Sequence, residues 1–153
     1  MTDSVKEPVT EDLGKPPPRW VLKIFTRINV FVYKLSGGRL MSTLSGMPIV
    51  VVTMTGAKSQ RTITIPLMYV PHDKGFILVA SQGGAPKHPS WYYNLVKHPN
   101  IEITHEGVTR QLTARRVSED EKAILWPTCV EYYPPYEQYQ RRTKRLIPVF
   151  LCE

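Results

Sequence analysis

The chain has 153 residues, a length most simply explained by one domain with a substantial hydrophobic core. Its hydrophobic content of 42% and charged content of 22% are ordinary for a soluble globular protein, and its formal net charge is +7. This charge favours polyanionic ligands, nucleic acid or an anionic membrane surface without choosing among them.

Several classes of protein are disfavoured at once. Cys129 and Cys152 are too far apart in the sequence for a metal-binding pair, and the four histidines lack the spacing of a zinc site. A disulfide scaffold is not expected at this size, so we expect a reducing, cytoplasmic compartment. The acidic, polar N-terminus does not resemble a secretory signal, and no apolar run reaches the ~20 residues that span a bilayer.

The first 35 residues predict an arm and a helix. Residues 1–18 are polar and end in three prolines, which favours a flexible arm. Residues 19–35 repeat apolar side chains at helical spacing, with cations between them. This helix either docks on the core or also contacts a membrane surface or covers an apolar pocket. Residues 39–48 read as irregular.

A basic hairpin is expected next. Residues 49–53 form a continuous β-branched run, typical of a strand buried on both faces, and residues 62–65 alternate polar with apolar. The turn between them, residues 56–61, carries Lys58 and Arg61. Such a turn binds phosphate when its N–H groups form a concavity beside cations, and is otherwise a solvated hairpin tip.

A glycine-rich loop follows the third predicted strand. Residues 71–75 read as a turn and residues 76–80 as a strand, which ends in Ser81-Gln82-Gly83-Gly84. The glycines allow a positive φ or the close approach of a ligand. No Gly-x-Ser-x-Gly elbow surrounds Ser81, so a nucleophile is unsupported; its hydroxyl suits donation to a carbonyl or oxyanion. The alternative is a simple loop.

The second half predicts two helices and three strands. Residues 89–96 form a short aromatic helix, in which a buried Asn94 would need hydrogen-bond partners. Residues 101–104 and 108–117 form a strand pair that turns at 106–107, with one exposed face. Residues 118–130 form a helix with Ser118 and Glu121 as a capping box. Residues 146–151 are a final strand returning to the sheet.

Residues 131–142 are aromatic and basic. Tyr133, Tyr136 and Tyr139 fall on one side of a turn or helix, where they wall a pocket for a flat or quinone-like molecule or staple the last helix to the core. Nucleic-acid stacking is a third alternative, because four cations follow: Arg141, Arg142, Lys144 and Arg145. No nucleic-acid-binding motif accompanies them, so we expect a solvated basic face and no nucleic-acid partner.

The order of elements indicates an α+β fold with a small barrel. A Rossmann domain is disfavoured, because it requires strands alternating with long helices and a Gly-x-Gly-x-x-Gly turn.

Several sequence blocks in this order resemble the deazaflavin (coenzyme F420)-dependent nitroreductase family. They include residues 27–29, 55–58, 66–67, 80–85, 89–92, 94–95, 126–127 and 147–149, together with the spaced tyrosines. The resemblance runs from about residue 18 to the C-terminus. It implies one split β-barrel domain over residues 19–153, like FMN-binding and pyridoxamine-phosphate-oxidase-like proteins.

The resemblance also assigns residues to coenzyme F420. The phosphate and acidic tail would lie on the turn of Ala57, Lys58, Ser59, Gln60, Arg61, Thr62 and Ile63. The deazaflavin ring would be bordered by Pro66, Leu67 and Met68, by Val79, Ala80, Ser81, Gln82 and Gly83, and by Ser90, Trp91, Tyr92, Tyr93 and Asn94. Ser81, Tyr133, Tyr136 and Tyr139 would face the acceptor as catalytic residues, with Tyr136 also at the cofactor. Ala57, Ile63 and Met68 depart from the family's usual arginines and tyrosine.

The resulting hypothesis is a cytoplasmic or peripherally membrane-associated oxidoreductase. It would pass a hydride from reduced F420 to a menaquinone-like quinone or to a nitroaromatic or conjugated acceptor, as a monomer or homodimer. The alternatives are an FMN-dependent oxidoreductase on the same barrel, a non-catalytic deazaflavin carrier, and a membrane-surface binding protein.

Overall fold

The computed structural model describes residues 43–44 and 47–153. The predicted arm and the predicted helix 19–35 lie outside the described residues. The elements run in the order β1 (Thr43–Leu44), β2 (Met47–Thr55), β3 (Thr62–Met68), β4 (Val70–His72), β5 (Gly75–Val79), η1 (Gln82–Gly84), α2 (Ser90–Lys97), β6 (Asn100–His105), β7 (Val108–Arg116), α3 (Glu119–Tyr132), α4 (Pro135–Arg142) and β8 (Val149–Cys152).

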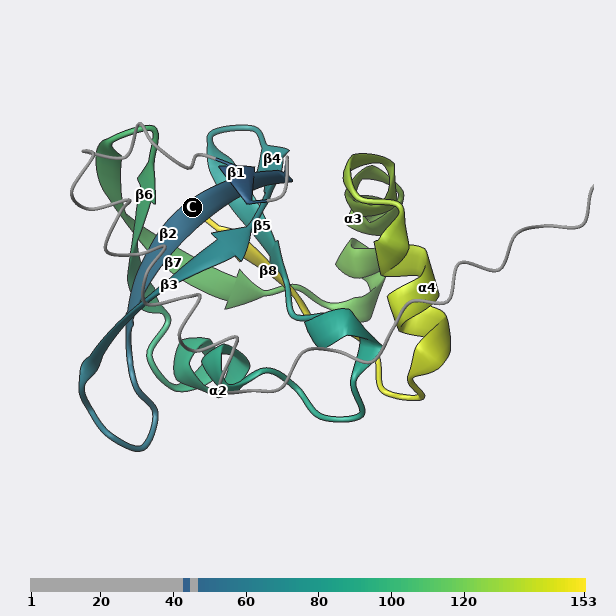
Figure 1. Ribbon diagram of the computed structural model, residues 1–153, viewed down its shortest axis with the longest axis horizontal. Helices are drawn as coiled ribbons and strands as arrows, with labels where there is room; N and C mark the ends of the chain where they lie inside the picture. Colours follow the sequence, from purple (N-terminus) through teal and green to yellow (C-terminus); the bar gives the residue numbers. More distant parts are fainter. Residues whose placement is uncertain (1–42, 45–46) are drawn as a thin grey trace, which may run out of the picture.

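The strands form one curled antiparallel sheet, a split β-barrel (Figure 1). Its order is β1-β2-β6-β7-β8-β5-β4, and β3 pairs with β2 off this path. Helices α3 and α4 lie together on one side, while α2 lies apart from them, below the barrel in this view (Figure 1). No described helix is long and apolar enough to cross a membrane.

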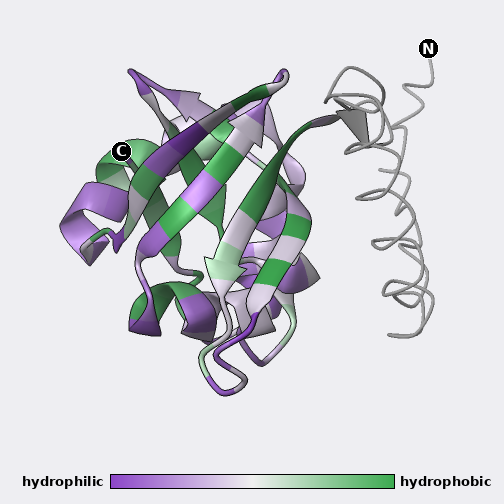
Figure 2. Ribbon diagram, turned by 90° about the vertical axis from the view of Figure 1, so that its left-hand side faces the viewer, coloured by the Kyte–Doolittle hydropathy of each residue, from purple (hydrophilic) through white to green (hydrophobic). Residues whose placement is uncertain are grey.

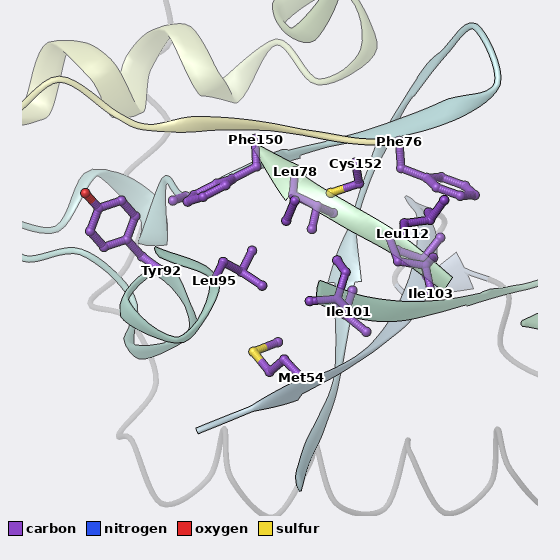
Figure 3. Close-up of a cluster of buried hydrophobic side chains, with 14 residues drawn as sticks. Met54, Phe76, Leu78, Tyr92, Leu95, Ile101, Ile103, Leu112, Phe150 and Cys152 are labelled. Atoms are coloured by element: carbon purple, nitrogen blue, oxygen red, sulfur yellow. The ribbon is translucent and has the colours of Figure 1, made fainter. Parts of the chain in front are cut away.

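The barrel is filled by one apolar cluster and flanked by a second. Phe76, Leu78 and Phe150 point into the barrel with the inward residues of β2, β6 and β7 (Figure 3). The intervening residues of the same strands, such as Ile77 and Val149, pack instead against α3 and α4. β5 and β8 therefore present one row of side chains to each cluster, as the two-residue period of a strand dictates. These central strands are buried on both faces, and hydropathy alternates along other strands (Figure 2).

Most of the predicted elements are present. The β2–β3 hairpin pairs Thr53 with Thr64 and Val51 with Pro66, and Val50 and Val52 are fully buried. The capping box at the start of α3 is also confirmed, because Ser118 Oγ accepts from the N–H of Glu121 and the carboxylate of Glu121 accepts from the N–H of Ser118.

Two predictions of local structure were wrong. Residues 71–75 are not all turn, because residues 70–72 form β4 and pair with β5 around a tight turn at Asp73 and Lys74. Residues 39–48 are not wholly irregular, because residues 43–44 form β1 and β2 begins at Met47. Of the turn or helix expected around Tyr136 and Tyr139, the helix is confirmed: residues 135–142 form α4, which begins at Pro135, a residue type favoured in the first helical turn.

Candidate functional site

The tip of the β2–β3 hairpin is a hydrogen-bonded turn that carries basic side chains without acidic partners in the described chain. The N–H of Gly56 donates to Arg61 O at 2.8 Å, and the N–H of Gln60 donates to Gly56 O at 3.0 Å. Lys58 and Arg61 are exposed, and neither pairs with a carboxylate in the part of the chain that the structure describes. The N–H groups of Lys58 and Ser59 also lack a partner among these residues. Free N–H groups beside unpaired cations suit an anion.

Helix α2 holds this turn in place. The N–H of Ala57 donates to Asn94 Oδ1 at 2.8 Å, and Lys97 Nζ donates to Ala57 O at 2.8 Å. Asn94 is 8% exposed, and its Nδ2 faces Met54 Sδ at 3.5 Å. The prediction that a buried Asn94 needs partners is therefore confirmed, and its partner is the turn itself. Lys97 was missed by sequence reasoning; it adds a third cation beside Lys58 and Arg61.

The glycine loop after β5 takes the expected backbone conformation. Gln82, Gly83 and Gly84 have φ values of 44°, 63° and 76°. A side chain at Gly84 would meet the carbonyl oxygen of Tyr139, so the close approach at this glycine is to α4. Gly83 faces open space. Ser81 is buried, and its hydroxyl makes no hydrogen bond within residues 43–44 and 47–153.

The basic residues after the tyrosines do not form one solvated face. Arg141 is exposed and pairs with Glu137 at 3.3 Å, as expected for such a face. Arg145 is different, because its guanidinium donates to carbonyl oxygens of the glycine loop. Arg142 also reaches the loop, with Nη1 at 3.3 Å from Gly83 O. The prediction of a solvated face was wrong for Arg145, whose partners lie about sixty residues earlier in the chain.

The three tyrosines come together but differ in access. Tyr133 and Tyr139 place their hydroxyl oxygens 3.1 Å apart. Burial, followed by the hydrogen bond with Tyr139, raises the pKa of Tyr133 to about 12, so this phenol stays protonated at neutral pH. Tyr136 is 3% exposed within the second apolar cluster, and burial raises the pKa of Tyr136. Tyr136 therefore has the contacts of the aromatic staple, whereas Tyr133 and Tyr139 are only partly buried.

The other residues assigned to the cofactor occupy different surroundings. Leu67 packs on the barrel interior and Met68 on the second cluster, because successive strand residues face opposite sides. Pro66 is half-buried, Ala80 is fully buried, and Val79 belongs to the second cluster. Residues 59, 60, 62, 82, 83 and 90 are exposed, while Ile63 and Trp91 are half-buried against the barrel interior.

Helix α2 connects the turn and the loop. Tyr92 is buried at the rim of the barrel, with its hydroxyl pointing away from the cluster (Figure 3). It stacks on His88 at 4.2 Å between ring centroids, and its hydroxyl accepts from Arg116 at 2.8 Å. Tyr93 is 52% exposed. The helix lies between the hairpin tip and η1 (Figure 1), so the predicted groups border one another through α2.

Two cavities lie outside this region. One, of about 320 Å³, lies between α3 and α4 and is lined by residues that include Lys122, Trp126 and Leu146. The other lies at the β4–β5 turn beside Arg110. Neither is lined by the hairpin tip or the glycine loop.

The donor set suits a flat ligand with an anionic tail. The hairpin tip supplies cations and free N–H groups, and the glycine loop supplies exposed backbone and the Ser81 hydroxyl, which has no partner in the described chain. Coenzyme F420 combines a flat deazaflavin with a phosphate and an acidic tail, so these residues fit it.

Comparison with known proteins assigns the family. The family model described as F420H(2)-dependent quinone reductase matches residues 25–153. An F420H(2)-dependent quinone reductase of Mycobacterium tuberculosis is 34% identical over 127 residues, which cover 80% of this chain and 85% of that protein.

Two solved structures agree with the fold. One, an F420-H2 dependent reductase (FDR-A), is 45% identical with a TM-score of 0.64, covering 69% of this chain and 94% of that chain. Another, described as a domain-swapped dimer, is 37% identical with a TM-score of 0.65, covering 90% of this chain and 100% of that chain. The matches give no support to the FMN alternative. The chain belongs to the F420H(2)-dependent quinone reductase family and is an oxidoreductase that uses coenzyme F420.

Proposed function

We propose that this protein transfers a hydride from reduced F420 to a quinone of the menaquinone type. The match of residues 25–153 to a family described as quinone reductases is the observation that carries this choice. It favours a quinone over the nitroaromatic acceptor that the sequence left open. When bound, the reduced cofactor supplies the hydride, and the protein supplies binding, orientation and proton donors.

The residues of the chain divide these tasks by position. Lys58 and Arg61 bind the anionic tail, with Lys97 beside them. The backbone of residues 80–83 borders the ring, and Ser81 offers a hydroxyl there. Tyr133 and Tyr139 lie on the α3–α4 side of the glycine loop, where Gly84 abuts the backbone of Tyr139. A protonated tyrosine hydroxyl polarises a quinone carbonyl by donating a hydrogen bond to it.

Stopped-flow mixing tests the acceptor. Reduced F420 and menadione are mixed with the protein, and oxidation of the cofactor is followed by absorbance against a protein-free control. We expect menadione to be reduced faster than a nitroaromatic acceptor at equal concentration. Equal rates with and without protein, or a preference for the nitroaromatic, would contradict quinone reduction.

Tyrosine variants test the proton donors. Tyr133→Phe and Tyr139→Phe should each lower kcat by roughly 100-fold, which is the low end of the typical contribution of a positioned proton donor. Tyr132→Phe is the matched control, because Tyr132 lies at the end of α3, 51% exposed, and is not part of the hydroxyl pair. If kcat is unchanged in both variants, these hydroxyls are not proton donors in the reaction.

A further inference from the structure

One guanidinium group binds both ends of the glycine loop. Arg145 lies between α4 and β8, and its Nε donates to Ala85 O at 2.8 Å, while Nη2 donates to Ser81 O at 2.8 Å. Its Nη1 lies 3.3 Å from Ala80 O and 3.1 Å from His88 Nδ1. A planar fork of fixed N–H directions is suited to hold several acceptors at once, which a lysine ammonium is not.

The loop needs such a support because its backbone is unusual. Three successive residues, Gln82, Gly83 and Gly84, have positive φ, and Gln82 pays a steric cost for it. Three carbonyl groups of residues 80–85 converge on Arg145. Carbonyl oxygens held close together repel one another unless a donor lies between them, so the cation stabilises this shape.

The backbone around Arg145 is itself fixed. Gln140 Nε2 donates to Arg145 O at 2.8 Å, and Gln140 Oε1 accepts from the N–H of Ile147 at 2.9 Å. The N–H of Arg145 donates to Thr143 Oγ1 at 3.3 Å. The side chain therefore approaches the loop from a rigid base, so that little entropy is lost on contact.

The hydrogen-bond partners of Arg145 indicate that it holds the backbone conformation of the glycine loop. Within the described residues no carboxylate pairs with it, and its acceptors are carbonyl oxygens and an imidazole nitrogen. An arginine that served charge balance would face an acid. This one is partly buried behind a loop whose front includes the exposed Gln82 and Gly83.

We propose that Arg145 is a positioning residue for the deazaflavin site: it holds the backbone of residues 80–85 in the conformation against which the ring lies. The proposal rests on the proposed function, because it takes the ligand of this loop to be the ring of coenzyme F420. Arg145 acts through the loop and does not contact the ring itself.

The experiment compares Arg145→Ala and Arg145→Lys with Arg141→Ala, a control that removes an equal charge from the exposed face of α4. Hydrogen–deuterium exchange of the protein without cofactor is measured first. We expect faster exchange at residues 81–88 in both Arg145 variants and wild-type exchange there in the control. The thermal unfolding midpoint shows whether each variant is still folded. If Arg145→Ala has unfolded, the comparison is made with Arg145→Lys alone.

Binding is then measured by fluorescence with two ligands, coenzyme F420 and the deazaflavin riboside without phosphate or tail. The Arg145 variants should bind both ligands roughly tenfold more weakly, because the loop loses the hydrogen bonds that hold its shape. This factor corresponds to about 1.4 kcal/mol in the free energy of binding. Methylguanidinium should restore part of the affinity of Arg145→Ala, which a general loss of stability would not allow.

The outcomes separate this proposal from the function itself. If the wild type binds neither ligand, the proposed function fails. If the wild type binds both, and folded Arg145→Lys binds them with wild-type affinity and shows wild-type exchange in the loop, Arg145 has no positioning role.

Discussion

At the scale of single residues, Asn94 shows how a buried amide can serve a site that it does not itself form. Its Oδ1 accepts from the N–H of Ala57, and Lys97 binds the carbonyl of the same residue. Both backbone groups of Ala57 are thus bound by α2. The family resemblance assigns Asn94 to the cofactor, and the structure shows its carbonyl oxygen already used to fix the turn.

Removing this amide should destabilise the fold and loosen the turn. Asn94→Ala leaves the N–H of Ala57 without its partner, so we expect a loss of about 1–3 kcal/mol in the free energy of unfolding, measured by urea denaturation. Asn100→Ala is the control, because Asn100 is exposed and its Oδ1 accepts only one long bond, at 3.5 Å. Equal losses in the two variants would refute a special role for Asn94.

At the scale of elements, the β2–β3 hairpin carries two exposed cations in the turn whose backbone is hydrogen-bonded to α2. Lys58→Ala combined with Arg61→Ala should weaken binding of coenzyme F420 by roughly tenfold and flatten its dependence on salt, because exposed charges are screened by ions. Affinity for the riboside without the anionic tail should not change. Fluorescence titrations at two ionic strengths measure both.

A matched control separates this turn from the overall charge. Lys74→Ala combined with Arg141→Ala also removes two exposed cations from a chain of net charge +7. If this pair weakens binding as much as the hairpin pair, the tail has no specific site at residues 57–61. The Arg145 variants should instead weaken binding of both ligands, and this contrast would assign the two ends of the cofactor to separate elements.

At the scale of the whole molecule, His88 joins α2, the glycine loop and the C-terminal segment. It stacks on Tyr92, and its Nδ1 accepts from Arg145. Burial, followed by the charges of Arg145 and Arg116, lowers the pKa of His88 from its ordinary value of 6.5. The unfolded chain therefore binds a proton at His88 more readily than the folded chain does.

Stability should consequently depend on pH through this residue. Its contribution is fully present above pH 6.5 and is lost as the pH falls toward the lowered pKa of folded His88. Urea denaturation of the wild type and of His88→Gln between pH 5 and 8 measures the difference. We expect the stability of the wild type relative to the variant to fall on acidification. A difference that stays constant or grows toward acid pH would contradict the assignment.

The sequence predicted the parts of this architecture that depend on local pattern. The β-branched run at 49–53 and the alternation at 62–65 predicted the hairpin, because strand period and burial are visible in adjacent residues. β4 was missed because Pro71 and Asp73 resemble a turn. For α4 the sequence left a turn or a helix open, because a proline pair hides where the helix begins.

Contacts between distant segments could not be predicted in this way. Arg145 looked like one of four solvated cations, because its acceptors lie 57 to 65 residues earlier in the chain. The sequence indicated that a buried Asn94 needs a hydrogen-bond partner, but it did not indicate which residue that partner is. Only the fold brings Ala57 to Asn94 and the loop to Arg145.

The absence of a side-chain carbon at Gly84 limits which substitutions the glycine loop can accept. A methyl group there would collide with the carbonyl of Tyr139 and crowd Arg142. Any replacement would push α4 outward and carry the phenol of Tyr139 with it. Changes in which molecules are reduced should therefore be easier to obtain by substitutions around this contact than by a substitution at Gly84 itself.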